Sequence, residues 1–165
     1  MFLNHTNHMK EVILNAPSEA ETIHIGHLLA SEVFADFSGI VYLQGTLGTG
    51  KTTLARSIIQ GLGWTDSVKS PTYTLVELYE VKEKQVAHMD LYRLGDPEEL
   101  EFIGIRDFTD GNTLCLIEWP ENGMGILPMA DLHIMITDSG NGRTLTLHSN
   151  NHRLTNKIAD ISKRQ

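Results

Sequence analysis

Cysteine, long apolar runs and basic charge are all scarce in this chain, and each shortage excludes a class of protein. The single cysteine, Cys115, cannot form a disulfide within the chain, and because it sits in an apolar run we expect a small buried hydrophobe rather than a nucleophile. No apolar stretch approaches the roughly 20 residues that cross a bilayer. The N-terminus lacks the basic start and apolar centre of a signal peptide, so we expect a cytoplasmic protein that does not bind membranes.

The charge balance is acidic, with 21 Asp and Glu residues against 13 Lys and Arg residues and a formal net charge of −8. Proteins that grip RNA or DNA unaided usually carry a basic footprint. Direct, tight binding of nucleic acid is therefore disfavoured. A protein partner, or a nucleic acid held by that partner, stays open.

The most informative motif is the run Gly45-Thr-Leu-Gly-Thr-Gly-Lys-Thr52, which matches the Walker A pattern G-x-x-x-x-G-K-[ST]. The apolar run over residues 39–44 predicts a buried strand before it, and the spacing of Leu54, Ile58 and Leu62 predicts a helix after it. Strand, glycine loop and helix together indicate a phosphate site. Backbone N–H groups and the helix N-terminus would face the phosphate oxygens.

Two side chains of this loop have predicted roles in binding a nucleoside triphosphate with Mg²⁺. Lys51 is expected to reach the β- and γ-phosphates, and the Thr52 hydroxyl is expected to coordinate the metal. The predicted nucleotide-binding set is the P-loop, the residue after it and one residue of a later loop: Gly45, Thr46, Leu47, Gly48, Thr49, Gly50, Lys51, Thr52, Thr53 and Thr72.

Two carboxylates compete for the acidic position that such a site needs at the end of a neighbouring strand. Asp90 and Glu118 each end an apolar run. The usual residue type favours Asp90, whereas the almost wholly apolar strand before Glu118 is typical of a central parallel strand. We assign Glu118 to the metal, directly or through its water ligands. Asp90 would lie behind the metal ligands or position a water. The predicted catalytic residues are therefore Lys51, Asp90 and Glu118.

The hydroxyl-rich segment Ser70-Pro-Thr-Tyr-Thr74 lies where P-loop switches sense the γ-phosphate. Thr72 and Thr74 are therefore switch candidates. An ordinary proline turn with capping hydroxyls accounts for the same residues equally well.

The sequence offers no clear hydrolytic base or arginine finger for this site. No residue stands out as a hydrolytic base, and Arg93, Arg106 and Arg143 are the arginines considered for the phosphate edge. Without a clear base or arginine finger, hydrolysis alone should be slow, and a partner could supply what is missing.

The sequence favours ATP over GTP. The segment 156–160 has one residue too many for a guanine-specificity motif, and the Asp-x-x-Gly of residues 36–39 precedes the P-loop. The pairs His5/His8 and His24/His27 have helical spacing but no matching ligand set, so we expect surface histidines rather than a metal site.

The predicted elements form a single α/β domain. A capping box at Ser18 and Glu21 predicts a helix to about Phe34, and Asp96 before a proline predicts a short helix interrupted at Gly104. The predicted strands cover residues 39–44, 75–81, 85–90, 112–119, 131–137 and 143–148, with a further short strand possible over 11–15.

The close spacing of two strand pairs implies hairpins, so the sheet should be mixed. We expect a P-loop NTPase-like domain over residues 1–150, with a mostly parallel central sheet flanked by helices and an antiparallel hairpin. Residues 151–165 are predicted to be a C-terminal tail, either helical or disordered.

Four stretches together resemble the TsaE (formerly YjeE) family, the bacterial ATPases of tRNA threonylcarbamoyladenosine biosynthesis. The resemblance spans about residues 18–148. The P-loop alone is shared with many families, but its combination with the other three stretches is highly specific. The stretches are Gly45-Thr-Leu-Gly-Thr-Gly-Lys-Thr-Thr53, Ser70-Pro-Thr-Tyr-Thr-Leu75, His88-Met-Asp-Leu-Tyr-Arg-Leu94 and Leu116-Ile-Glu-Trp-Pro120.

The resemblance implies a role for each matching position. It places the Walker A lysine on Lys51, the Mg²⁺-binding hydroxyl on Thr52, the Walker B acid on Glu118 and the Asp of the His-x-Asp-Leu-Tyr-Arg motif on Asp90. It also implies ATP and Mg²⁺ as cofactors and TsaD and TsaB as partners. Those two carry threonylcarbamoyl transfer to adenosine 37 of tRNAs reading ANN codons. ATP hydrolysis would drive or reset that complex, with tRNA contacted only indirectly.

Two rival functions stay open on the sequence. The first is a small-molecule or nucleotide kinase, which generally needs an Arg-rich lid; residues 119–130 contain no basic residue, which argues against a lid there. The second is a nucleotide-gated binding module without useful turnover.

Overall fold

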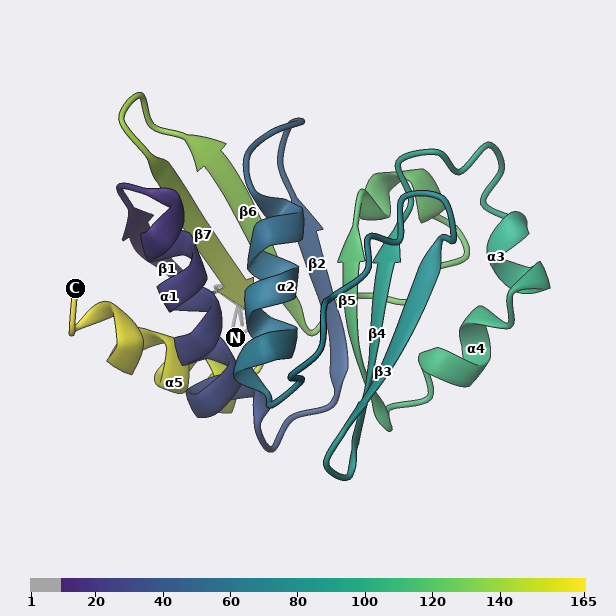
Figure 1. The fold of residues 1–165 in the computed structure, drawn as a ribbon, viewed down its shortest axis with the longest axis horizontal. Coiled ribbons are helices and arrows are strands. Elements are labelled where there is room, and N and C mark those ends of the chain that lie inside the picture. Colours follow the sequence, from purple (N-terminus) through teal and green to yellow (C-terminus); the bar gives the residue numbers. More distant parts are fainter. Residues whose placement is uncertain (1–9) are drawn as a thin grey trace, which may run out of the picture.

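A seven-stranded sheet with the order β1-β7-β6-β2-β5-β4-β3 runs through the computed structural model, which describes residues 10–165 (Figure 1). The strands are β1 (Lys10–Ala16), β2 (Gly39–Gln44), β3 (Val76–Val81), β4 (Lys84–Asp90), β5 (Thr113–Glu118), β6 (Leu132–Asp138) and β7 (Arg143–Ser149). The α-helices are α1 (Glu19–Leu29), α2 (Lys51–Gly61), α3 (Glu99–Phe102), α4 (Ile105–Phe108) and α5 (His152–Ser162). A π-helix, η1 (Ala30–Phe34), continues α1, and a 3-10 turn, η2 (Pro120–Gly123), follows β5.

The centre of the sheet is parallel and its edges are antiparallel. β2 pairs in parallel with both β5 and β6, and β4 pairs in parallel with β5. The hairpins β3–β4 and β6–β7 and the pair β1–β7 are antiparallel. The predicted mixed α/β sheet is thus confirmed. Because parallel strands point the same way, the carboxyl ends of β2, β4 and β5 meet at one edge, where the P-loop begins.

The two faces of the sheet bury separate hydrophobic clusters, because successive strand residues point to opposite faces. Val41 and Leu43 of β2 belong to the larger cluster, which α1, α2 and α5 cover, whereas Ile40 and Tyr42 belong to a smaller one that α3 and α4 reach. Buried members of the larger cluster include Ile25, Leu29, Leu54, Ile58, Leu114, Leu116, Leu145, Leu147, Leu154, Ile158 and Ile161. No helix among the described residues has the length and apolar character that crossing a bilayer requires.

The helix after the P-loop is held in place by α1, which lies beside it on the same face of the sheet (Figure 1). A Cβ on Gly26 would come within 1.7 Å of Ser57 Oγ, so only glycine allows the two helices to approach this closely. The predicted capping box is present in part: Ser18 Oγ accepts a hydrogen bond from the Glu21 N–H at 3.3 Å. The close approach of Gly26 to Ser57 holds α2 beside α1.

The region predicted to start a helix at Asp96 is only partly helical. The Asp96 side chain accepts a hydrogen bond from the Glu98 N–H, and α3 begins at Glu99 and lasts four residues. Gly104, with φ of 73°, separates it from α4. Leu100 and Ile105 from these two short helices fill the smaller cluster.

The predicted C-terminal tail is a helix that packs on the sheet. Asn151 caps α5 by accepting hydrogen bonds from the N–H groups of Arg153 and Leu154. Leu154, Ile158 and Ile161 are buried in the larger cluster. The tail therefore belongs to the same hydrophobic core as the P-loop helix.

Replacing Ile158 with alanine should lower the free energy of unfolding by about 2–5 kcal/mol, because it leaves a cavity in the larger cluster. The control is Asn156→Ala on the exposed side of the same helix, for which we expect a change within about 0.5 kcal/mol. Chemical denaturation followed by circular dichroism measures both. Equal, small losses for the two variants would contradict the packing of α5 on the core.

Candidate functional site

The P-loop joins the end of β2 to the start of α2 at the carboxyl edge of the sheet. Gly50, directly before α2, has φ of 101°, in the left-handed region that side chains disfavour. Apart from its chain neighbours, none of the residues that the structure describes lies within 4 Å of a Cβ placed there, so backbone conformation rather than space requires the glycine. This geometry lets the chain turn into the helix with its first N–H groups facing the loop, as an anion site needs.

Lys51 lies folded over the loop. Its Nζ donates hydrogen bonds to the carbonyl oxygens of Gly45 at 2.6 Å and Thr46 at 3.0 Å, and it lies 4.3 Å from the centre of the Trp119 ring. Burial lowers the pKa of Lys51, and the negative charge of Glu118 opposes that shift. Within residues 10–165 the ammonium thus has backbone and aromatic partners, which an incoming anion can replace.

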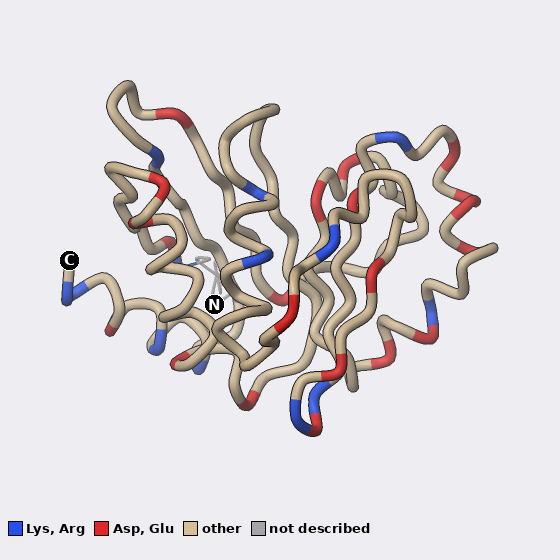
Figure 2. Tube along the Cα trace, in the orientation of Figure 1, with Lys and Arg blue, Asp and Glu red and all other residues tan. Residues whose placement is uncertain are grey.

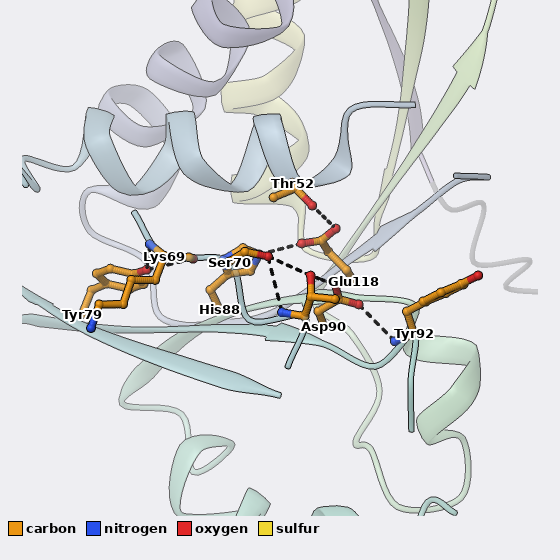
Figure 3. Close-up of polar contacts among 9 residues, drawn as sticks. Thr52, Lys69, Ser70, Tyr79, His88, Asp90, Tyr92 and Glu118 are labelled. Carbon is orange, nitrogen blue, oxygen red and sulfur yellow. Dashed lines mark hydrogen bonds and ion pairs between the residues drawn. The ribbon is translucent and has the colours of Figure 1, made fainter. Parts of the chain in front are cut away.

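Glu118, at the end of β5, is almost fully buried and shared between two partners (Figure 3). Its Oε1 accepts a hydrogen bond from Thr52 Oγ1 at 2.8 Å, and its Oε2 lies 2.7 Å from His88 Nε2. The structure therefore brings the two predicted metal residues together. Carboxylate and hydroxyl oxygens are hard ligands of the kind that Mg²⁺ prefers.

Asp90, at the end of β4, lies beside Glu118 in the parallel register of β4 and β5. Its Oδ1 accepts a hydrogen bond from the Tyr92 N–H at 3.0 Å, and its Oδ2 accepts one from Thr72 Oγ1 at 3.4 Å. Burial raises the pKa of Asp90; the Tyr92 N–H opposes the rise and the charge of Glu118 adds to it. Both predicted carboxylates thus sit at the same edge.

The Ser70–Thr74 segment contributes one of its two predicted switch hydroxyls to this edge. Thr72 Oγ1 lies 2.8 Å from Ser70 Oγ and also contacts Asp90. Thr74 is exposed and donates instead to Glu77 at 2.9 Å. Thr72 is therefore placed to affect Asp90, and Thr74 is not.

Of the clefts beside the P-loop, two adjoin Gly48 and Gly50. One of about 420 Å³ opens between the loop and the acidic strand ends. The other, of about 340 Å³, opens between the loop, the start of α1 and the β6–β7 turn. The first is lined by Leu47, Gly48, Gly50, Lys51, Thr52, Thr53, Thr72, Asp90, Tyr92, Arg93, Glu118 and Trp119.

Gly45 and Thr46 contribute carbonyls to Lys51, and the Thr49 hydroxyl turns into the loop to donate to the Thr46 carbonyl at 2.9 Å.

The three arginines considered for the phosphate edge have different surroundings. Arg143 donates to the carbonyl oxygens of Gly48 at 3.1 Å and Thr49 at 3.2 Å, so it braces the P-loop. Arg93 lines the larger cleft and stacks over a tyrosine ring. Arg106 lies on α4, exposed and paired with an acidic side chain, away from the site.

Two site residues were missed by the sequence analysis. Trp119 has φ of 56°, unusual for a residue other than glycine, and its ring contacts the ammonium of Lys51. His88 is fully buried against Glu118, although only paired histidines were considered as ligands. His24 and His27 are exposed as predicted, while His5 and His8 lie outside the described residues. The signal for His88 was available: it precedes Asp90 by two positions, so both face the same side of β4.

A glycine loop between a parallel strand and a helix, with a buried carboxylate at the end of the neighbouring strand, defines the P-loop NTPase-like class. The family model described as threonylcarbamoyl adenosine biosynthesis protein TsaE matches residues 16–145. The chain belongs to the TsaE family.

Similar proteins match over nearly their whole lengths. A tRNA threonylcarbamoyladenosine biosynthesis protein TsaE of Haemophilus influenzae is 43% identical over 157 residues, which cover 93% of this chain and 99% of the relative. One of Bacillus subtilis is 33% identical over 156 residues, covering 94% and 96%. The crystal structure of Bacillus subtilis YdiB superposes with a TM-score of 0.76 at 27% identity and covers 94% of this chain and 97% of that one.

The buried carboxylate of Asp90 predicts a specific pH dependence of stability. Because its pKa in the folded protein is raised above the ordinary value of 3.8, the native state holds this proton more tightly than the unfolded state. This group therefore makes wild-type stability fall as pH rises through the acid range above 3.8. Asp90→Asn lacks that contribution, so its stability relative to wild type should increase with pH and then level off.

Denaturant titrations at a series of pH values measure this difference. Asp66→Asn, at an exposed position, controls for loss of one negative charge. If the free energy of unfolding of Asp90→Asn minus that of wild type stays constant or decreases as pH rises, the burial argument is contradicted.

Proposed function

We propose that this protein is a Mg²⁺-dependent ATPase subunit required for threonylcarbamoylation of adenosine 37 in tRNAs reading ANN codons. The observation that carries the proposal is the Thr52 hydroxyl 2.8 Å from the Glu118 carboxylate, beside a P-loop. The printed names of the relatives supply the pathway. The identity of 43% over nearly the whole chain supports its transfer to this protein.

The residues at this edge suit a magnesium–nucleotide complex. Thr52 and Glu118 would hold the metal or its water shell, with the phosphates supplying the remaining oxygen ligands. Within residues 10–165 there is no group of three or more His, Cys, Asp or Glu side chains that could hold a metal alone. Mg²⁺ usually takes only one or two protein carboxylates together with substrate phosphates, so such a group is not needed. Held by Thr52 and Glu118, such an ion would supply positive charge that offsets the negative charge of the phosphates.

The other side chains divide the remaining work. Lys51 would exchange the carbonyl oxygens of Gly45 and Thr46 for phosphate oxygens. Burial lowers the pKa of Lys51, and the charge of Glu118 opposes that shift. Asp90 orients the attacking water, and its raised pKa brings it closer to what a general base needs. Thr72 links the state of that carboxylate to the Ser70–Thr74 segment.

The phosphate edge holds few cations for the transition state. Arg143 is occupied by P-loop carbonyls, which leaves Arg93 as the arginine that lines the larger cleft. Turnover by the isolated chain should therefore be slow and should increase when partners complete the site. We propose TsaD and TsaB as those partners, in the cytoplasm.

Contact with tRNA is proposed to be indirect. Figure 2 shows acidic residues gathered along α3, α4 and the loop before them. The Lys and Arg residues along α5 and just after it pair with carboxylates. Nucleic-acid sites need clustered positive charge to neutralise phosphates. The net charge of −8 points the same way.

The smaller cleft is proposed to receive the nucleoside of ATP. It adjoins Gly48 and Gly50 on the side of the P-loop away from Glu118. Ser18, Thr22 and Asn141 give it hydroxyl and amide groups that can bond a ribose or a base.

The alternative function, a kinase, would need a basic lid, and residues 119–130 do not provide one. Residues 119–130 carry no Lys or Arg. Ile126 and Leu127 of this segment pack against the smaller cluster, and the Tyr42 hydroxyl donates to the Pro128 carbonyl. A segment held in this way is not free to close over a second substrate.

Two substitutions separate the roles of metal and phosphate binding. Glu118→Gln should lower ATP turnover by roughly 100-fold or more while leaving nucleotide binding measurable, because it removes the charge that faces the metal. Lys51→Ala should weaken nucleotide binding itself. Glu83→Gln, an exposed carboxylate in the β3–β4 turn at the end of β4 opposite Asp90, is the control and should keep wild-type turnover. Unchanged turnover in Glu118→Gln would refute its role.

The partners provide the second test. ADP release should rise when purified TsaB and TsaD are added together to the wild-type chain. Phosphorylation of a small acceptor would support a kinase instead. Tight ATP binding without turnover, with or without the pair, would favour a nucleotide-gated binding module.

A further inference from the structure

His88 is a buried polar side chain that has one hydrogen-bond partner within the described part of the chain. It lies on β4, in register with Leu116 of β5 and Glu77 of β3, and its side chain has no solvent exposure. Burying an imidazole without compensation is costly, so its one partner matters. That partner is the Glu118 carboxylate, at 2.7 Å (Figure 3).

The direction of this hydrogen bond follows from the two groups. An ionised carboxylate has only acceptor sites, so Nε2 of His88 carries the proton and donates it to Glu118 Oε2. The other ring nitrogen, Nδ1, has no hydrogen-bond partner among the described residues. A histidine kept only to hold the core together would be expected to satisfy both nitrogens. Among the described residues, the His88 ring makes its hydrogen bond to Glu118 and to no other side chain.

The two oxygens of Glu118 are divided between two elements. His88 of β4 holds Oε2, and Thr52 of α2 holds Oε1. Rotation of the carboxylate would break one or both bonds, so the carboxylate is fixed with Oε1 toward the P-loop helix. Lys51 lies near enough to Glu118 for the two charges to interact, but its ammonium donates hydrogen bonds to backbone carbonyls and not to this carboxylate.

We propose that His88 is a positioning residue for the metal-binding carboxylate: its Nε2–H holds Oε2 of Glu118 so that Oε1 stays directed to Thr52 and the cation. This rests on the proposed function, because it concerns the same metal shell. Hydrogen bonds from outside the shell orient carboxylate ligands and commonly change metal affinity by about 10–100-fold.

Three variants separate positioning from packing. In His88→Gln the side-chain amide can place an N–H near the position of Nε2, whereas the shorter side chain in His88→Asn reaches only the position of Nδ1. His88→Leu fills the space without a donor. Thermal melts monitored by circular dichroism show whether each variant folds. If His88→Leu does not fold, the comparison of His88→Gln with His88→Asn still tests the proposal.

The measurement is Mn²⁺ binding in the presence of ADP, titrated by electron paramagnetic resonance, with ADP affinity in EDTA measured in parallel. We expect His88→Leu and His88→Asn to bind Mn²⁺ about 10–100-fold more weakly than wild type, and His88→Gln to lie within about threefold of it. Metal-free ADP affinity should match wild type in all three, since His88 acts through Glu118 and not through the P-loop.

Three results would overturn the inference alone. They are wild-type Mn²⁺ affinity in His88→Leu and His88→Asn, a loss in folded His88→Gln as large as in His88→Asn, and a parallel loss of metal-free ADP affinity. A wild-type protein that binds ADP but no Mn²⁺ would overturn the proposed function as well, so the two failures are distinguishable.

Discussion

The site depends on the Glu118 carboxylate and its two hydrogen bonds. Through Thr52 it is tied to the first turn of α2, and through His88 to the strand that also carries Asp90. Three elements distant in sequence thus meet at one side chain. The parallel register of β4 and β5 makes this possible, because it sets Asp90 beside Glu118 at the same edge of the sheet.

Lys51, Glu118 and Asp90 each have hydrogen-bond partners within the protein. Lys51 bonds P-loop carbonyls, Glu118 bonds Thr52 and His88, and Asp90 bonds the Tyr92 amide. A hydrogen bond exchanged for another of similar quality changes the free energy by only about 1 kcal/mol. Under the proposed function, nucleotide binding would proceed by exchange of partners around a fixed frame, with the brace from Arg143 holding the loop.

Local patterns predicted the parts of the fold and site that depend on neighbours in sequence. β2, the glycine loop and α2 follow one another within a short run, and the buried strand β5 is recognisable from its apolar residues. Glu118 could therefore be assigned from the end of that strand. The packing of α5 was not predicted, because Leu154, Ile158 and Ile161 are spaced among polar residues that also suit a solvated tail.

Contacts between distant residues were harder to infer. The pairing of His88 with Glu118 requires the β4–β5 register, which no local pattern gives. The brace from Arg143 to Thr49 likewise depends on where β7 begins relative to the P-loop. The choice between Thr72 and Thr74 was set by the path of an irregular loop. Its Lys69 N–H donates to the Tyr79 hydroxyl at 3.0 Å, a contact that turn preferences do not specify.

A crystal structure with Mg²⁺ and a non-hydrolysable ATP analogue tests the central claim most directly. The account predicts a cation held by Thr52 Oγ1 and, directly or through water, by Glu118, with Lys51 Nζ moved from the carbonyls of Gly45 and Thr46 to phosphate oxygens. A nucleotide bound away from the P-loop, or a complex in which Lys51 and Glu118 keep their present partners, would contradict it.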